Sequence, residues 1–186
     1  MPVRVIAGAA KGRRLKMVPG KGTRPVMDRV KEALFNILGS AVEGCRFLDL
    51  FAGTGSVGIE ALSRGAAEAV FVENDPAALR TIRANLDLTG FAGVAQVVPA
   101  DVFRYLERPP VEGFDFIYIA PPQYQRLWSR TLLAIDAKPG VLYPDGVAIA
   151  QIDPKEFAAL DLQTLVLYDQ RRYGKTMLCF YERPSA

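Results

Sequence analysis

The sequence predicts an α/β fold: a doubly wound sheet that is mostly parallel, with an antiparallel pair of strands at its C-terminal end. From residue 45 onward, β-prone runs alternate with helical segments, and this order favours parallel strands joined by crossover helices. Runs such as Phe116-Ile117-Tyr118-Ile119 contain few polar residues, which is typical of strands covered on both faces. The last two strands are too close in sequence for a crossover helix, so we expect them to pair antiparallel.

The individual elements follow from the spacing of apolar residues and from turn residues. Residues 3–6 and 14–18 are predicted to form a hairpin around the turn-rich segment 7–12, and a helix is predicted from Pro25 to Leu38, ended by Gly39. Strands are then expected at 46–50, 69–73, 94–98, 114–119 and 147–152, with helices at 57–64, 76–88, 102–106 and 125–135. The final strands are expected at 164–168 and 177–182, joined by 169–176.

Length and composition exclude several classes of protein. The chain has 186 residues, half of them hydrophobic, which suits one α/β domain with a short appendage but not two ordinary domains. No apolar run approaches the roughly 18 residues of a membrane helix, and the first residues lack the pattern of a signal peptide, so we expect a cytoplasmic protein. The chain contains no histidine, which excludes Ser-His-Asp and Cys-His catalysis and any His-ligated metal site; no metal is expected.

The charge is concentrated at the N-terminus. Residues 1–46 contain ten Lys or Arg but only three acidic residues, whereas the whole chain has a net charge of +3. We therefore predict a basic appendage over residues 1–44 and a main domain over 45–186. Such a segment suggests an anionic partner, with a phosphate backbone as the first candidate, although a solvated arm without a specific partner fits the charge equally well.

Two cysteines, Cys45 and Cys179, lie beside predicted strands and far apart in the sequence. We interpret them as reduced, half-buried thiols of an intracellular protein.

The strongest local signal is a glycine-rich loop between a strand and a helix. Gly53, Gly55 and Gly58 match the pattern G-x-G-x-x-G, in which glycines allow a tight turn and a close approach of the backbone to a ligand. Glu73 ends the next strand, where an acid can accept hydrogen bonds from ribose hydroxyls. These features predict an adenosine-containing cofactor, although a purely structural turn has the same pattern.

Two further acids favour a cofactor other than a dinucleotide. Asp49 comes just before the loop, where a carboxylate can face a ligand ammonium but would repel a pyrophosphate. Asp101 follows the third strand of the main domain, where it can accept from an adenine amino group or cap the next helix.

A Pro-Pro pair follows the fourth strand of the main domain. In Ala120-Pro121-Pro122-Gln123-Tyr124, the stiff turn lacks N–H groups and presents carbonyl oxygens at the edge where open α/β sheets bind ligands. These carbonyls can accept from an exocyclic amine, and Tyr124 can stack on a base. A rigid loop with an exposed aromatic residue is the simpler alternative.

With these motifs in view, the chain resembles a class I S-adenosylmethionine-dependent methyltransferase with a Rossmann-like sheet, and more narrowly the RsmD family. The resemblance runs nearly from end to end of the chain. The segments that carry it are Val5–Gly8 with Lys11–Arg13, Thr23–Pro25 with Asp28–Asn36, Leu48–Gly55, Glu60–Ala66 and Tyr173–Thr176. The block from Thr23 to Asn36 is the most specific, because many methyltransferases share the glycine loop.

The resemblance implies an enzyme that uses S-adenosyl-L-methionine to methylate N2 of a guanine in 16S rRNA of the small ribosomal subunit or its assembly intermediate. The residues expected to bind the cofactor are Asp49, Phe51, Gly53, Gly55, Glu73, Asn74, Asp101 and Val102. The residues expected near the RNA are Lys11, Arg13, Arg14, Lys16, Arg24, Arg29 and Lys31. The residues expected at the reacting amine are Ala120, Pro121, Pro122 and Tyr124.

One position departs from the family pattern, in which Asp or Asn precedes the Pro-Pro pair and an aromatic residue follows it. Here Ala120 precedes the pair, and Tyr124 stands one place later than the usual aromatic residue. Three alternatives therefore stay open: a methyltransferase for another nucleobase or a protein amide, an RNA-binding assembly protein that has lost catalysis, and, less in keeping with Asp49 and the Pro-Pro loop, an NAD-dependent oxidoreductase.

Overall fold

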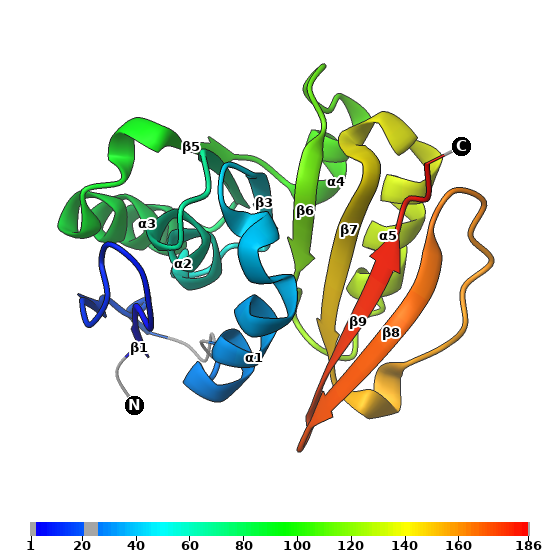
Figure 1. The fold of residues 1–186 in the computed structure, drawn as a ribbon, viewed down its shortest axis with the longest axis horizontal. Coiled ribbons are helices and arrows are strands. Elements are labelled where there is room, and N and C mark those ends of the chain that lie inside the picture. Colours follow the sequence, from blue (N-terminus) through cyan, green and yellow to red (C-terminus); the bar gives the residue numbers. More distant parts are fainter. Residues whose placement is uncertain (1–2, 21–25, 186) are drawn as a thin grey trace. The chain divides into compact units, whose positions relative to one another are not determined.

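The structure is a computed structural model that describes residues 3–20 and 26–185. The chain forms two compact units, one up to Asp101 and one from Val102 onward (Figure 1). Each unit is described by itself. In the described residues, no helix is both long enough and apolar enough to cross a membrane.

The first unit is built on three parallel strands in the order β5-β4-β3. Helix α2 joins β3 to β4, and helix α3 joins β4 to β5, as expected for parallel strands with crossover helices. The core includes the fully buried side chains of Phe47, Leu50, Phe71 and Ile82. The elements are α1 (Asp28–Leu38), a 3₁₀ turn (Gly39–Val42), β3 (Arg46–Leu50), α2 (Ser56–Ser63), β4 (Glu68–Glu73), α3 (Pro76–Thr89), a 3₁₀ turn (Ala92–Val94) and β5 (Ala95–Pro99).

The N-terminal hairpin is confirmed but has shorter strands than predicted. Strands β1 (Val3–Arg4) and β2 (Arg14–Leu15) form a separate antiparallel sheet in which Val3 pairs with Leu15. Helix α1 begins at Asp28 rather than at Pro25, because Met27 has an extended backbone and is the N-terminal cap. Pro25 itself lies outside the described residues.

The second unit contains four strands in the order β6-β7-β9-β8, with helix α5 on one face of the sheet (Figure 1). Strands β6 and β7 are parallel, and the pairs β7–β9 and β8–β9 are antiparallel. The elements are α4 (Val102–Glu107), β6 (Phe114–Ile119), α5 (Leu127–Ala137), β7 (Leu142–Ile152), β8 (Val166–Tyr173) and β9 (Thr176–Glu182), with 3₁₀ turns at Pro139–Val141 and Pro154–Glu156.

The predicted bounds of β7 and β8 were wrong: β7 begins at Leu142 rather than at 147, and β8 runs over Val166–Tyr173 rather than over 164–168. Strand β7 begins before residue 147, because the chain passes through an irregularity at which its register with β6 shifts and Asp145 adopts a left-handed conformation. The Pro-Asp-Gly sequence there has the pattern of a turn. The connection of the C-terminal strands is a turn at Gly174 and Lys175, and the preceding residues up to Tyr173 belong to β8.

The fold class is nevertheless confirmed: the protein is mixed α/β, with parallel strands in both units and an antiparallel pair at its C-terminal end. Cys45 and Cys179 are free thiols, as expected, but both are fully buried rather than half-buried. Cys45 directly precedes β3, and Cys179 lies within β9, where burial raises the pKa of its thiol.

Candidate functional site

The glycine-rich loop joins the end of β3 to the start of α2 through three residues in the left-handed backbone region. These are Phe51 (φ 60°), Gly53 (φ 58°) and Gly55 (φ 81°). The Gly55 N–H donates to the Ala52 carbonyl oxygen at 2.8 Å, which closes the turn. Glycine adopts this conformation without steric cost, whereas Phe51 is an uncommon residue there. The motif therefore forms the tight turn that the sequence predicted.

Gly58 has a different role, because it lets α2 lie close to β4. A Cβ atom at this position would be 2.4 Å from Cε1 of Phe71, nearer than real Cβ contacts allow. The third glycine of the motif thus fits the close helix–strand packing expected of it.

Asp49 is a buried residue near the end of β3, and its carboxylate contacts the backbone of α2. Its Oδ2 accepts a hydrogen bond from the Gly58 N–H at 3.0 Å. The pKa of Asp49 is raised to about 8, mainly by burial and to a smaller extent by the negative charge of Glu73, and the Gly58 hydrogen bond opposes the shift. A buried carboxylate that is costly to ionise is suited to receive a cationic group. A contact of Asp49 with a ligand ammonium stays a prediction.

Glu73 connects the glycine-rich loop to the start of α3. Its Oε1 accepts from the Gly53 N–H at 2.9 Å, and its Oε2 accepts from the N–H groups of Asn74 at 3.0 Å and Asp75 at 2.9 Å. A carboxylate offers about four acceptor positions, and these bonds use three. Glu73 can therefore hold the loop and still accept a hydrogen bond from a ribose hydroxyl.

The remaining predicted cofactor residues lie at the same edge of the first unit, with one exception. Asn74 is exposed between Glu73 and the helix cap Asp75. Asp101 is exposed just after Ala100, whose N–H donates to the Glu73 carbonyl oxygen at 3.1 Å. Val102 is the exception, because it is the buried first residue of α4 and belongs to the second unit.

The Pro-Pro loop follows β6 in the second unit. Ala120 and Pro121 are half-buried, and Pro122 is exposed. Tyr124 is 64% exposed and has a left-handed backbone (φ 62°). The Tyr124 N–H donates to Oε1 of Glu156 at 2.6 Å, and its hydroxyl donates to the Asp153 carboxylate. The loop is thus anchored to residues that follow β7.

The sequence interpretation missed Asp153 and Glu156. They form a capping box around the 3₁₀ turn after β7, in which the Asp153 side chain accepts from the Lys155 N–H at 2.9 Å. The hydrogen bond from Tyr124 lowers the pKa of Asp153 and raises that of Tyr124. An Asp followed three residues later by Glu is a recognisable cap signal, but nothing local indicated that it would also bind Tyr124.

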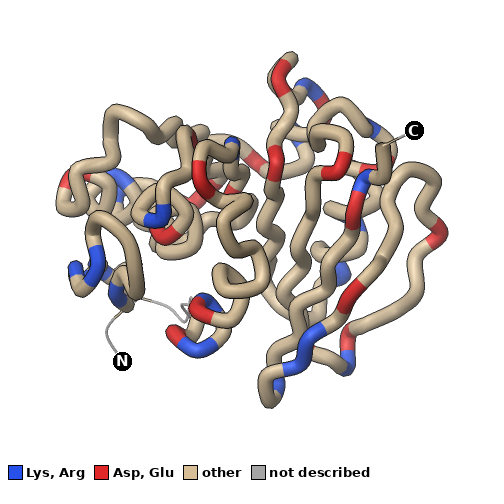
Figure 2. The backbone as a smooth tube through the Cα atoms, in the orientation of Figure 1, with Lys and Arg blue, Asp and Glu red and all other residues tan. Residues whose placement is uncertain are grey.

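The predicted RNA-contacting residues are exposed, with one correction. Lys11, Arg13, Arg14 and Lys16 lie on the hairpin and Arg29 on α1, all exposed, and Figure 2 marks the basic positions along these segments. Arg13 also donates to the Leu88 carbonyl oxygen at 2.8 Å. Arg24 lies outside the described residues.

Lys31 is the correction. Its side chain is 0% exposed and pairs with Glu60 at 3.2 Å, so it cannot contact RNA from this position. Burial lowers the pKa of Lys31, and the Glu60 carboxylate opposes that shift. The family resemblance implied a place for Lys31 near the RNA, but Glu60, a distant acid in α2, binds its side chain in the interior.

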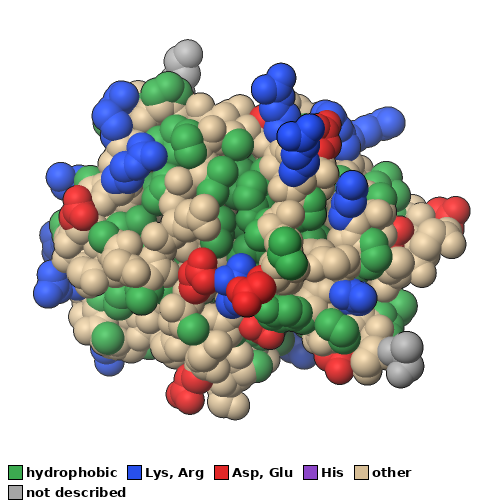
Figure 3. Space-filling model, turned by 90° about the horizontal axis from the view of Figure 1, so that it is seen from above, with side chains coloured by type: hydrophobic (Ala, Val, Ile, Leu, Met, Phe, Trp, Pro, Cys, Tyr) green, Lys and Arg blue, Asp and Glu red, His purple; other side chains and the backbone are tan. Residues whose placement is uncertain are grey.

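On the face seen in Figure 3, Lys and Arg side chains stand in several groups, with hydrophobic and acidic side chains between them. This face of the molecule is therefore not uniformly basic. Within the described ranges, no group of three or more Cys, Asp or Glu residues is arranged to hold a metal ion.

The fold, the glycine-rich loop and the acid at the end of the next strand define a class I S-adenosylmethionine-dependent methyltransferase. An RNA methyltransferase from Salinibacter ruber, solved with S-adenosyl-L-homocysteine, shares the fold (TM-score 0.67, 15% identity, 88% of this chain and 95% of that one). The chain belongs to the RsmD family: residues 3–182 match the family model described as "Conserved hypothetical protein 95".

Named proteins with similar sequences support this family assignment. The "Putative rRNA methyltransferase YlbH" of Bacillus subtilis is 38% identical over 97% of this chain and 99% of its own length. Ribosomal RNA small subunit methyltransferase D of Haemophilus influenzae is 39% identical over 70% of this chain and 68% of its own length. A solved structure of yhhF from Escherichia coli has a TM-score of 0.87 at 29% identity and covers 99% of both chains.

Proposed function

We propose that this protein transfers a methyl group from S-adenosyl-L-methionine to N2 of a guanine in the 16S rRNA of the small ribosomal subunit, in the cytoplasm. The choice of substrate rests on the sequence similarity to the Haemophilus influenzae relative named ribosomal RNA small subunit methyltransferase D. The choice of guanine N2 as the acceptor atom goes beyond the name of this relative and is part of the proposal.

The cofactor residues of the first unit support this chemistry. When bound, S-adenosyl-L-methionine supplies an electrophilic methyl group on a sulfonium, so the chain needs no histidine. Glu73 is proposed to accept from the ribose hydroxyls, Asp49 to face the ammonium group, and Asp101 to accept from the adenine amine. Phe51, Gly53, Gly55 and Asn74 are proposed to complete the binding residues of the first unit. Val102, which follows Asp101 in the chain, is proposed as a further one.

The exposed bases support binding of the RNA. Lys11, Arg13, Arg14, Lys16 and Arg29 are proposed to contact phosphates, because such contacts provide most of the sequence-independent affinity for nucleic acid. Residues 1–44 are proposed to present this surface and residues 45–186 to perform methyl transfer. Arg24, which lies outside the described residues, is proposed to contact the RNA as well.

The Pro-Pro loop is proposed to receive the amine. The carbonyl oxygens of Ala120 and Pro121 would accept hydrogen bonds from it, and Pro122 would stiffen the turn. These acceptors strengthen as the nitrogen gains positive charge during transfer, which favours the transition state. The exposed ring of Tyr124, held through its hydroxyl, is available to stack on the base once the base has left its pairing partner.

The test is methyl transfer from tritiated S-adenosyl-L-methionine to small subunits prepared without this modification, followed by mass mapping of the RNA. We expect one guanine to gain a methyl group on N2. A methyl group on another base or on a protein amide would replace the proposal with a different methyltransferase. RNA binding without any transfer would indicate the assembly protein that the Ala120 substitution leaves open.

A further inference from the structure

Two fully buried polar side chains contact the N-terminal hairpin, and each also contacts the glycine-rich loop or the first residue of α2 directly after it. They are Lys31 of α1 and Asn85 of α3, both 0% exposed. The hairpin carries the proposed RNA-contacting bases, and the loop carries the cofactor residues. Both side chains therefore stand between the two proposed ligand sites of the first unit.

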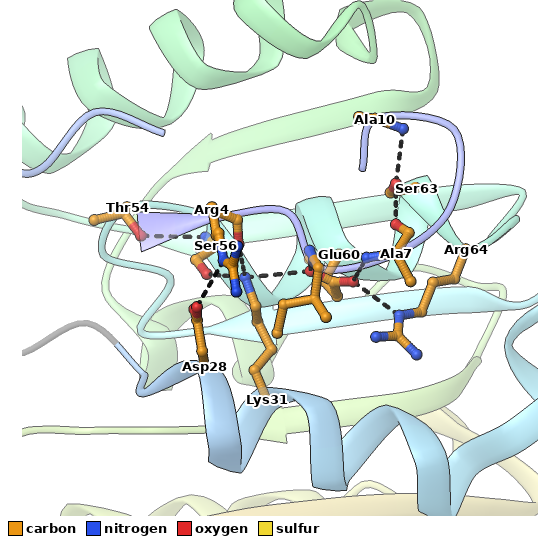
Figure 4. A network of polar contacts seen from close by, with 12 residues as sticks. Arg4, Ala7, Ala10, Asp28, Lys31, Thr54, Ser56, Glu60, Ser63 and Arg64 are labelled. Carbon is orange, nitrogen blue, oxygen red and sulfur yellow. Dashed lines mark hydrogen bonds and ion pairs between the residues drawn. The ribbon is translucent and has the colours of Figure 1, made fainter. Parts of the chain in front are cut away.

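Lys31 links the first hairpin strand to the start of α2 (Figure 4). Its Nζ donates to the Arg4 carbonyl oxygen at 2.6 Å and contacts the Ser56 hydroxyl oxygen at 3.0 Å, and it pairs with Oε1 of Glu60 at 3.2 Å. An ammonium group has three protons, so these three oxygens match its full donor capacity. Ser56 in turn donates its backbone N–H to Oγ1 of Thr54 at 3.2 Å, within the loop.

Asn85 makes the corresponding link from the second hairpin strand. Its Nδ2 donates to the Lys16 carbonyl oxygen at 3.1 Å and to the Thr54 carbonyl oxygen at 2.9 Å, and its Oδ1 accepts from the Lys16 N–H at 2.7 Å. The amide thus both donates to and accepts from the backbone of Lys16, which lies directly after β2. It also bonds the loop at Thr54.

The tip of the hairpin is fixed to α2 as well. Glu60 accepts from the N–H groups of Ile6 at 2.9 Å and Ala7 at 3.1 Å, and the Ser63 hydroxyl bonds the backbone of Ala7 and Ala10. Figure 4 shows these bonds along one side of α2. A shift of the hairpin would leave several of these groups unpaired, at about 1–3 kcal/mol for each buried group.

We propose that Lys31 and Asn85 are positioning residues that couple RNA binding at the hairpin to cofactor binding at the Thr54–Ser56 segment. This inference rests on the proposed function. RNA on the hairpin holds Arg4 and Lys16 in place, and through Lys31 and Asn85 this holds the loop in the arrangement that accepts the cofactor. Coupling between two sites is reciprocal, so the cofactor raises the affinity for RNA by the same factor.

The experiment compares cofactor affinity with and without RNA in the full chain. The dissociation constant of S-adenosyl-L-methionine is measured by calorimetry in the absence of RNA and with a saturating 16S rRNA transcript. We expect RNA to tighten cofactor binding by about 5-fold or more in the wild type, within the usual range of site coupling. Ser56→Ala and Asn85→Ala should each bring this factor close to one.

The controls separate coupling from general damage. Thr81→Ala is the matched control, because Thr81 is also buried on α3 but bonds within its own helix, to the Ala77 carbonyl oxygen at 2.9 Å. It should keep the wild-type factor. Ser56→Ala leaves the Lys31–Glu60 pair intact, so it decides the question if Asn85→Ala does not fold, as judged by thermal unfolding.

The outcomes are distinguishable. The coupling alone would be overturned if the wild type methylates the transcript or the small subunit but RNA leaves its cofactor affinity unchanged. It would also be overturned if the variants keep the wild-type increase in cofactor affinity. A wild type that neither binds nor methylates RNA would overturn the proposed function and the coupling with it.

Discussion

The Glu73 carboxylate accepts a hydrogen bond from the Gly53 N–H at 2.9 Å, across 20 residues of sequence. The same group bonds the first two N–H groups that follow it, so one side chain shapes the glycine-rich loop and orders the approach to α3. The acid expected to hold the cofactor ribose is therefore also a structural part of the site before any ligand binds.

Replacement of this acid should weaken cofactor binding strongly. Hydrogen bonds to a charged group are worth about 1.5–3 kcal/mol each, so we expect Glu73→Ala to raise the dissociation constant of S-adenosyl-L-methionine by roughly 10- to 100-fold. Calorimetry measures the change. Glu68→Ala, at the other end of β4, is the control and should bind normally. Unchanged affinity in Glu73→Ala would count against the assigned site.

Asp49 should make cofactor binding depend on pH. The pKa of Asp49 is raised to about 8, and a cationic ligand prefers the ionised form, so we expect affinity to rise as pH increases from about 6 and to stop rising near pH 8, where an α-amino group loses its own proton at a pKa of about 8. Asp49→Asn keeps an acceptor for the Gly58 N–H but does not titrate. It should therefore lack this part of the pH dependence. Parallel affinity curves for the two proteins would show that Asp49 does not face the cation.

The same shift predicts the pH dependence of stability. The unfolded carboxyl titrates near pH 4, so the folded protein binds the proton more tightly between about pH 4 and 8. The stabilisation from the raised pKa is complete below pH 4 and is lost as pH rises through about 8. The free energy of unfolding of the wild type relative to Asp49→Asn should fall over this range, by at most about 1.4 kcal/mol per pH unit. Urea denaturation at pH 5, 7 and 9 measures it.

Lys31 should be needed for stability rather than for contact with RNA. Lys31→Met removes one of the two cations that pair with the buried Glu60 and leaves Arg64, at 2.8 Å, as the other. We expect the free energy of unfolding to fall by about 1–3 kcal/mol, the usual cost of leaving a buried polar group without a partner. Arg29→Ala, on the exposed face of the same helix, should change the free energy of unfolding by no more than about 0.5 kcal/mol. Denaturant unfolding compares the two variants. Equal effects would contradict the buried role of Lys31.

The exposed hairpin bases should contribute to RNA affinity through phosphate contacts. We expect Arg14→Ala to weaken binding of a 16S rRNA transcript similarly across sequences and to reduce the slope of log affinity against log salt by about 1. Filter binding at several salt concentrations measures the slope. Glu107→Ala, at the end of α4, is a control of opposite charge. An unchanged slope for Arg14→Ala would remove this residue from the RNA surface.

Restoration of the family side chain before the Pro-Pro pair should be tolerated. We expect Ala120→Asn and Ala120→Asp to keep or raise the rate of methyl transfer to undermodified small subunits, because either side chain adds an acceptor for the target amine. Single-turnover assays report the chemical step. Complete loss of activity in folded protein would mean that the loop, anchored by Tyr124 to Asp153, works with a different geometry.

The sequence by itself determined the order of elements, the glycine-rich turn and the family of this protein. The strand Arg46–Leu50 and the strand Phe114–Ile119 were predicted at their observed bounds, because runs of apolar residues and the turn residues that follow them act locally. The positions of Asp49 and Glu73 at strand ends followed from the same local pattern.

Only the tertiary structure decided which polar side chains are buried and what they bind. Lys31 has the spacing of an exposed helical residue, yet Glu60 and Ser56 of α2 hold it in the interior. Asn85 has no local motif, and its partners lie in the hairpin and the loop. Burial of a polar group depends on partners brought together from distant parts of the chain, and a pattern read along a single sequence does not contain those pairings.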